Sequence, residues 1–178
     1  MALKKKFSEI EVPLINEKVY ILGEKENILK KTIKIDISKK LKGKSCEAVF
    51  SIREMDGKFV ALPKRITVLK SYIIKLIRNK TSCIEDSFST QSKDVILKVK
   101  PFLITRRKIP RSLRKELREK IKEILIENFK EMEFLEICEN ILNENIQKEI
   151  VTKIKKIYPP LAFEIREIET KEKINFKK

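Results

Sequence analysis

Residues 94–125 read DVILKVKPFLITRRKIPRSLRKELREKIKEIL, and the spacing of the apolar residues changes within this stretch. Up to residue 104 the pattern is that of a strand, and Pro101 predicts that this strand lies at a sheet edge or is interrupted. From residue 112 apolar residues recur at helical spacing, with Pro110 just outside the helix and Ser112 as its expected N-cap. A strand that leads through a basic connection into a helix favours an α+β protein.

The preceding part of the chain predicts a β-hairpin. Residues 44–54, KSCEAVFSIRE, alternate apolar and polar residues as in a half-buried strand. Asp56-Gly57 is a strong hairpin turn, and residues 58–69 form the expected partner strand, in which Pro63 marks an edge or a bulge. Ser71 is expected to cap a short helix, YIIKLIRNK (72–80), that follows this hairpin.

Further strands and helices complete the predicted domain. Residues 83–89 are expected to pair with 94–104, and helical spacing recurs over 134–142 and 146–157. Tyr158-Pro159-Pro160 ends the last helix, and 161–169 predicts a final strand that returns to the sheet. The order of strands, helices and a closing strand predicts one α+β domain over 1–178, with short basic tails at about 1–6 and 171–178.

The composition excludes several classes of protein. The 178 residues contain no His, which removes the usual Ser-His and Cys-His nucleophiles and His-ligated metal sites. The three Gly lie too far apart for a phosphate-binding loop. Cys46, Cys83 and Cys138 are isolated and are predicted to be small buried apolar residues of a reducing compartment. With no signal peptide and no apolar run of membrane length, the sequence predicts a soluble intracellular protein. Because the His ligands and the phosphate-binding loop are missing, we expect no metal and no cofactor.

Catalytic patterns are weak. Ser112-Leu113-Arg114-Lys115 matches the spacing S-x-x-K that some acylated serine enzymes use, but the companion motifs are missing and a helix cap explains Ser112 better. The many carboxylates have the ordinary spacing of solvated helix faces, so that no acid–base pair stands out. We therefore expect no enzyme activity.

The charge is large and unevenly distributed. The formal net charge of +16 favours nucleic acid or another anionic surface, although a solvated Lys-rich surface is the alternative. Residues 98–122 hold eleven Lys or Arg and two Glu, whereas residues 123–149 hold two Lys and eight Glu. On the helix from residue 112, one side carries a basic row about a third of a turn from the apolar row: Arg111, Arg114, Lys115, Arg118 and Lys122.

We predict that these cations contact the phosphates of a folded RNA, because aromatic residues for base stacking make up only 7% of the chain. The Glu-rich stretch 127–144 is expected to face away from the RNA. The predicted RNA contacts are Lys4, Lys5, Lys6, Lys39, Lys40, Lys42, Lys44, Lys64, Arg65, Arg78, Arg106, Arg107, Lys108, Arg111, Arg114, Lys115, Arg118 and Lys122.

Five stretches, in chain order, resemble one known family. They are KFSEIEVP (6–13), LKGKSCEAVFSI (41–52), KSYIIKLIRNKTSCI (70–84), KDVILKVKPFLITRRKIPRSLRKELREKIKEIL (93–125) and KKIYPPLAFEIREIE (155–169). Together they resemble the S1e, or S3Ae, family of small-subunit ribosomal proteins of archaea and eukaryotes, in a short archaeal-like form.

The resemblance implies an α+β fold in which a barrel-like mixed sheet is flanked by helices. It also implies a cytoplasmic, non-enzymatic structural constituent of the small ribosomal subunit, on the platform near the 3′ end of the small rRNA and the mRNA exit. The implied partners are the small-subunit rRNA and neighbouring platform ribosomal proteins, with no membrane, cofactor or small-molecule substrate. A free-standing RNA-binding or RNA-chaperone-like protein of the same fold is the alternative.

The family motifs carry over to particular residues. The resemblance implies paired arginines after a strand, a capped basic helix, a short helix, a helix stop and a basic position on the last strand. These are, in turn, Arg106 and Arg107; Ser112 and Arg118; Ser71, Tyr72 and Arg78; Lys156, Tyr158 and Pro159; and Arg166.

Overall fold

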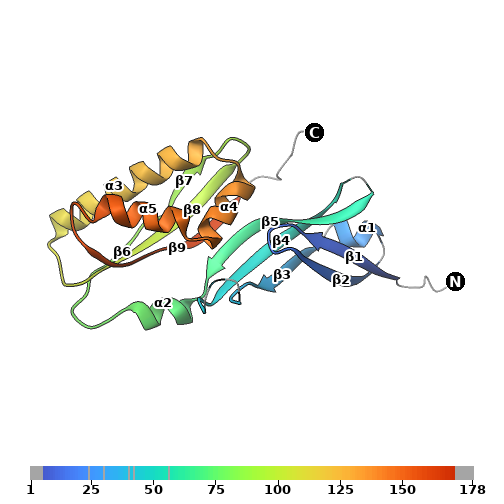
Figure 1. Cartoon of the computed structure of the whole chain (residues 1–178), viewed down its shortest axis with the longest axis horizontal. Helices are drawn as coiled ribbons and strands as arrows, with labels where there is room; N and C mark the ends of the chain where they lie inside the picture. Colours follow the sequence, from blue (N-terminus) through green and yellow to red (C-terminus); the bar gives the residue numbers. More distant parts are fainter. Residues whose placement is uncertain are drawn as a thin grey trace.

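The computed structural model describes residues 6–23, 25–29, 31–39, 41, 43–55 and 57–170. The described residues form one nine-stranded sheet and five helices (Figure 1). In chain order these are β1 (Lys6–Val12), β2 (Glu17–Gly23), α1 (Lys25–Leu29), β3 (Thr32–Asp36), β4 (Cys46–Met55), β5 (Lys58–Val68), α2 (Lys70–Leu76), β6 (Cys83–Glu85), β7 (Phe88–Gln91), β8 (Ile96–Thr105), α3 (Arg111–Lys130), α4 (Phe134–Leu142), α5 (Asn145–Ile154) and β9 (Pro160–Thr170).

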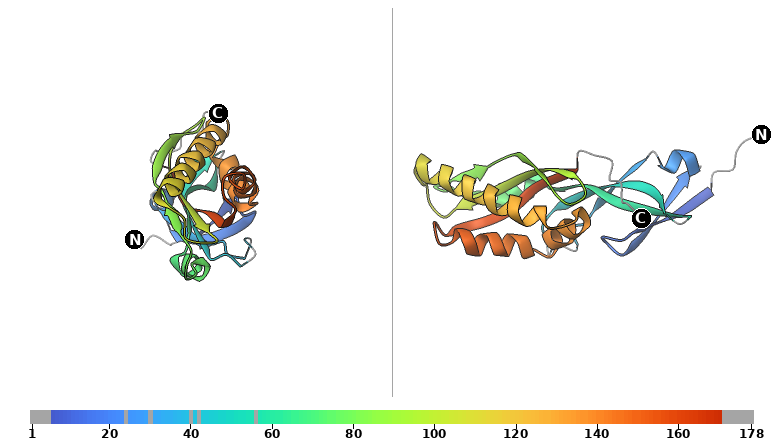
Figure 2. Two further views of the ribbon diagram at one scale, coloured as in Figure 1. Left: turned by 90° about the vertical axis from the view of Figure 1, so that its left-hand side faces the viewer. Right: turned by 90° about the horizontal axis from the view of Figure 1, so that it is seen from above.

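The sheet is mixed and open, and the molecule is elongated (Figures 1 and 2). Strands β1 to β5 with α1 form one end, and β6 to β9 with α3 to α5 form the other. Strand β5 joins the two: it pairs with β4 along one edge, and along the other edge it pairs with β1 in parallel and with β9 antiparallel. The predicted α+β class and helix-flanked mixed sheet are confirmed, and the sheet does not close on itself.

The β4–β5 hairpin confirms the prediction from alternation. The inward-facing Cys46, Ala48, Phe50 and Ile52 are buried. Pro63 lies at a bulge, because the pairing register shifts between Val49 and Phe50. A proline that donates no ladder hydrogen bond is tolerated there. In the turn, Gly57 has φ of +76°, which glycine adopts without strain, whereas Asp56 lies outside the described residues.

At the other end, α3 and α5 pack on β6, β7 and β9. The apolar row of α3 is buried as its spacing predicts, through Leu117, Ile121, Ile124 and Leu125. Strand β9 returns to the sheet as expected and pairs with β8 along nearly its whole length. Pro101 interrupts this pairing with a register shift, but β8 is an interior strand with β6 and β7 on its other side.

Both expected serine caps are wrong. Helix α3 begins at Arg111 with Pro110 as N-cap, and α2 begins at Lys70 with Leu69 as N-cap. Neither N-cap makes a side-chain cap hydrogen bond. Pro110 has an extended ψ of 160° and the helix starts at Arg111, two residues earlier than a serine cap at position 112 requires. Helix α2 also ends at Leu76, whereas the predicted helix included the basic residues that follow it.

Candidate nucleic-acid interface

The connection between β8 and α3 is a short loop with three exposed cations: Arg106, Arg107 and Lys108. Hydrogen bonds from the body of the protein hold this loop. The fully buried Thr105 accepts a hydrogen bond from the Ser82 N–H at 3.1 Å, and its hydroxyl donates to the Arg107 carbonyl at 2.7 Å. The Ile109 N–H donates to the Ser82 hydroxyl at 3.2 Å. The cations therefore project from a fixed backbone.

Four chain segments meet at this end of the molecule. The Thr105 N–H donates to the Ser82 carbonyl, which places the loop before β6 beside the loop after β8. Thr105 is also opposite Pro160, the first residue of β9. In Figures 1 and 2 the start of α3 and the end of α5 lie at the same end of the molecule.

We call the exposed cations of these segments the basic tip. Its members come from the loop before β6, the loop after β8, the first turn of α3 and the residues after α5. They are Arg78, Lys80, Arg106, Arg107, Lys108, Arg111, Arg114, Lys155 and Lys156.

The charge of the basic tip is uncompensated within the described part of the chain. No described carboxylate lies within ion-pair distance of any of its side chains, and residues 106–115 contain no Asp or Glu. The first turn of α3 has neither an acidic residue nor a side-chain cap, so its free N–H groups add positive potential. Repulsion among these groups costs folding free energy, and a bound polyanion removes that cost.

Two residues of the basic row along α3 have partners within the protein. Lys115 lies 3.8 Å from Glu119, and Lys122 lies 5.8 Å from the centre of the Phe88 ring. Between them, Arg118 borders an open hollow whose other walls include Asp86 and Arg166. Within the described residues, Arg111, Arg114 and Arg118 make no ion pair, and the first two lie next to the unpaired loop cations.

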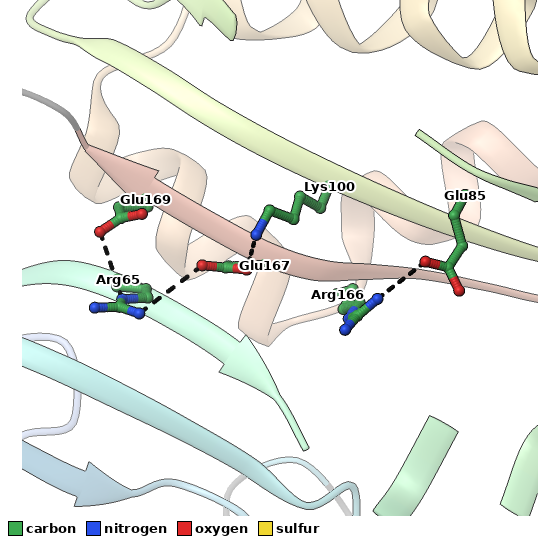
Figure 3. Close-up of polar contacts among 6 residues, drawn as sticks. All are labelled: Arg65, Glu85, Lys100, Arg166, Glu167 and Glu169. Atoms are coloured by element: carbon green, nitrogen blue, oxygen red, sulfur yellow. Dashed lines mark hydrogen bonds and ion pairs between the residues drawn. The ribbon is translucent and has the colours of Figure 1, made fainter. Parts of the chain in front are cut away.

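Besides Lys115, two residues that were predicted to contact RNA have carboxylate partners, Lys44 and Arg65. The Lys44 Nζ lies 2.6 Å from Glu144 and 2.7 Å from Glu164. The Arg65 Nε lies 3.6 Å from Glu169, across the β5–β9 pairing (Figure 3). These two side chains link elements of the protein to one another and lie outside the basic tip.

Figure 3 shows that the pairs around Arg65 continue across the sheet. Glu167 of β9 lies between Arg65 of β5 and Lys100 of β8, and Arg166 lies 2.9 Å from Glu85 of β6. Arg166, which the family resemblance assigned to a basic position, is therefore engaged with a carboxylate. These pairs compensate charge where the two ends of the sheet meet.

The remaining predicted contacts are dispersed. Lys39 and Lys64 are exposed and lie outside the basic tip. Lys4, Lys5, Lys40 and Lys42 lie outside the described residues, as does the side chain of Lys6. Conversely, Lys80, Lys155 and Lys156 belong to the tip although the sequence did not predict RNA contact for them. The adjacent lysines 155 and 156, just before the prolines that end the helix, were the feature of the sequence that could have indicated this contact.

The acidic residues gather at the opposite end of α3. Glu127, Glu131, Glu133, Glu136 and Glu139 are exposed. At about 1.5 Å of rise per residue, the 20 residues of α3 separate this acidic end from the basic tip by about 30 Å. The charge asymmetry in the sequence is therefore an asymmetry in space.

The three cysteines differ in their exposure to solvent. Burial raises the pKa of the Cys46 thiol to about 12 and raises that of Cys138 further, which leaves both as inert thiols. Cys83 is exposed, so the prediction of three buried cysteines is wrong for it. The described residues contain no cluster of three or more potential metal ligands, and none of the described helices is long and apolar enough to cross a membrane.

The fold and the tip define a basic α+β protein that presents uncompensated cations at one end of an open sheet. Residues 4–173 match the ribosomal S3Ae family, so the chain belongs to that family, as the resemblance predicted.

Three similar curated proteins, all from archaea, are named small ribosomal subunit protein eS1. The one from Nanoarchaeum equitans is 33% identical over 131 residues, which cover 71% of this chain and 66% of the relative. The one from Methanothermobacter thermautotrophicus is 37% identical over 99 residues, or 55% and 51% of the two chains. The one from Archaeoglobus fulgidus is 30% identical over 106 residues, or 59% and 50%. The chain thus spans between half and two thirds of the length of these relatives.

Proposed function

We propose that this protein is a non-enzymatic structural constituent of the small ribosomal subunit, which binds small-subunit rRNA by placing the basic tip against the sugar–phosphate backbone. The proposed contact with rRNA rests on the uncompensated charge of the tip. The proposed assembly, the small ribosomal subunit, rests on the names of the relatives. Guanidinium groups and free helix N–H groups on a fixed backbone suit phosphate oxygens. The lack of internal partners leaves these donors available.

The position proposed within the subunit is the platform, near the 3′ end of the small rRNA and the mRNA exit, beside neighbouring platform proteins. The protein would act in the cytoplasm as part of the ribosome. The acidic end of α3 would then face away from the rRNA, because like charges on the two would repel.

Sedimentation tests the assembly. The full-length chain is expected to migrate with small subunits and with whole ribosomes on a sucrose gradient. Its recovery only in light fractions, although it binds RNA, would reject the ribosomal role and support the alternative of a free-standing RNA-binding protein.

Tethered hydroxyl radicals test the orientation. With Cys83→Ser removing the exposed thiol, a cleavage reagent attached through Ser112→Cys, in the first turn of α3, is expected to cut rRNA near the 3′ end. The same reagent at Glu136→Cys, on the acidic end, is the matched control and should cut little. Equal cutting from both positions would contradict the proposed orientation, and strong cutting far from the 3′ end would contradict the platform position.

A further inference from the structure

Two isoleucines are exposed at the end of helix α2: Ile74 lies on the helix and Ile77 directly follows its last residue. Ile74 is 67% exposed and Ile77 is 43% exposed, whereas Ile73 is buried and anchors the helix to the protein. Ile77 is the C-cap residue, and its N–H still donates to the carbonyls of Ile73 and Ile74, so the separation of three residues keeps Ile74 and Ile77 on the same side. In Figures 1 and 2 this helix stands on the outside of the molecule, apart from α3, α4 and α5.

Cations border these isoleucines. Lys70 lies one turn before Ile74 on the same side of α2, and Lys75 lies next to it; both are exposed. Neither forms an ion pair with a described residue, and residues 70–84 contain no Asp or Glu. We call Lys70, Ile74, Lys75 and Ile77 the α2 face: an apolar centre with a basic border.

We infer that the α2 face docks into an apolar groove, bordered by Asp or Glu, on a neighbouring protein of the small subunit. The inference rests on the proposed function, which supplies the neighbour. An apolar centre inside a polar rim is the usual anatomy of a protein–protein contact, and side chains at i and i+3 are the usual anchors of a helix in a groove.

The basic border and the apolar centre of the α2 face together favour a protein partner over RNA. A sugar–phosphate backbone pairs with Lys70 and Lys75 but gives Ile74 and Ile77 nothing apolar to contact. The four residues of the α2 face include no aromatic ring or arginine on which a base could stack: Tyr72 is half-buried, and the exposed Arg78 that follows Ile77 belongs to the basic tip. The basic tip differs in this respect, because its exposed side chains are cations without an apolar centre.

Photo-crosslinking from two positions tests the inference. The full-length chain carries p-benzoylphenylalanine at Ser71, which is exposed and lies one turn before Ile74, or at Ser112, beside the basic tip. Small subunits that contain each variant are purified, irradiated and analysed by peptide mapping. Position 71 is expected to couple to a ribosomal protein, at a segment where apolar residues adjoin Asp or Glu, and position 112 to rRNA.

A second pair of variants tests the apolar centre. Ile74→Ser with Ile77→Ser is expected to reduce the protein cross-link from position 71 by about tenfold, as for the loss of two anchors. Met55→Ser is the matched control, because Met55 is also 43% exposed but lies on β4, and it should change nothing. Because all three side chains are solvent-exposed, the variants should fold, and unchanged circular dichroism checks this.

The outcomes separate the two proposals. If the chain enters subunits and position 112 reaches rRNA, but position 71 reaches rRNA or nothing, the docking inference is overturned while the proposed function stands. Coupling from position 71 that survives both serine substitutions also overturns it. If the chain is missing from the subunits, the proposed function fails, and the inference that depends on it fails too.

Discussion

The Lys44 ammonium group lies 2.7 Å from a carboxylate oxygen of Glu164, 120 residues further along the chain. Burial raises the pKa of Glu164, and the hydrogen bond from Lys44 offsets only part of that effect. Burial alone would lower the pKa of Lys44, but hydrogen bonds to Glu144 and Glu164 outweigh it and raise the pKa. This contact joins β9 to the segment before β4. It stabilises a buried carboxylate that would cost folding free energy if it were left unpaired.

Lys44→Met should reduce the free energy of unfolding at pH 7 by about 2 to 3 kcal/mol, because Glu164 then stays buried without its nearest cation. Without that cation the folded-state pKa of Glu164 rises further above its unfolded value. The native state then binds the proton more tightly than the unfolded chain, so the variant should regain stability as the pH falls from 7 through that pKa. Urea unfolding at pH 7 and pH 5 measures both effects.

The double variant Lys44→Met, Glu164→Gln is the control. With the carboxylate gone, the gain in stability between pH 7 and pH 5 should disappear, and stability at pH 7 should exceed that of Lys44→Met alone. If Lys44→Met unfolds with the same pH dependence as the unchanged protein, Glu164 does not depend on Lys44 for its charge.

The three cysteines should react at very different rates. Cys83 is exposed, while burial raises the pKa of Cys46 to about 12 and that of Cys138 further. A chromogenic disulfide reagent should therefore label only Cys83 in the native protein and all three thiols in urea. Burial and the nearby Glu85 also raise the pKa of Cys83, so its labelling should accelerate as the pH rises from 7 to 9. Cys83→Ser should abolish native labelling; labelling of a second thiol would show that the core opens.

Local periodicity predicted the elements that bury one continuous face. The β4–β5 hairpin, the apolar row of α3 and the returning β9 all follow from residues close in sequence. Strands β2 and β3 were missed because neither carries a fully buried face: their residues alternate only between exposed and half-buried.

The site was predictable only where its residues are consecutive. Arg106, Arg107 and Arg111 form a dense local run, and the structure leaves them unpaired. Lys155 joins them only because α5 runs back along α3, which charge density along the chain does not reveal. The reverse holds for Lys44, whose carboxylate partners lie about 100 residues or more away, so that in the sequence it looked like a free cation.

Thr105→Val should loosen the loop that carries the basic tip. The substitution keeps the shape of the buried side chain but leaves the Ser82 N–H and the Arg107 carbonyl without their partner. Thermal unfolding should show a loss of about 1 to 2 kcal/mol. Affinity for small-subunit rRNA should fall while the dependence of affinity on salt stays the same, because no cation is removed.

Thr90→Val is the matched control for the loop. Thr90 is also buried, but its hydroxyl makes no hydrogen bond with any described residue, and it lies on β7, away from the tip. This variant should bind rRNA as the unchanged protein does. If Thr105→Val loses stability yet binds rRNA normally, a fixed loop is not required for binding.

Replacing four arginines of the basic tip by alanine should change how rRNA binding depends on salt. Each lost phosphate contact should reduce the steepness of log affinity against log salt concentration by about 0.9, because fewer counterions are released. Filter binding from low to high salt measures this for Arg106, Arg107, Arg111 and Arg114. The control removes the same formal charge from the β1–β5 end, at Lys18, Lys31, Lys34 and Lys58. Because these lysines lie away from the proposed phosphate contacts, the control should change the affinity little and leave the slope nearly unchanged. Equal slopes for both variants would mean that the tip does not touch phosphate, since net charge by itself would then account for the binding.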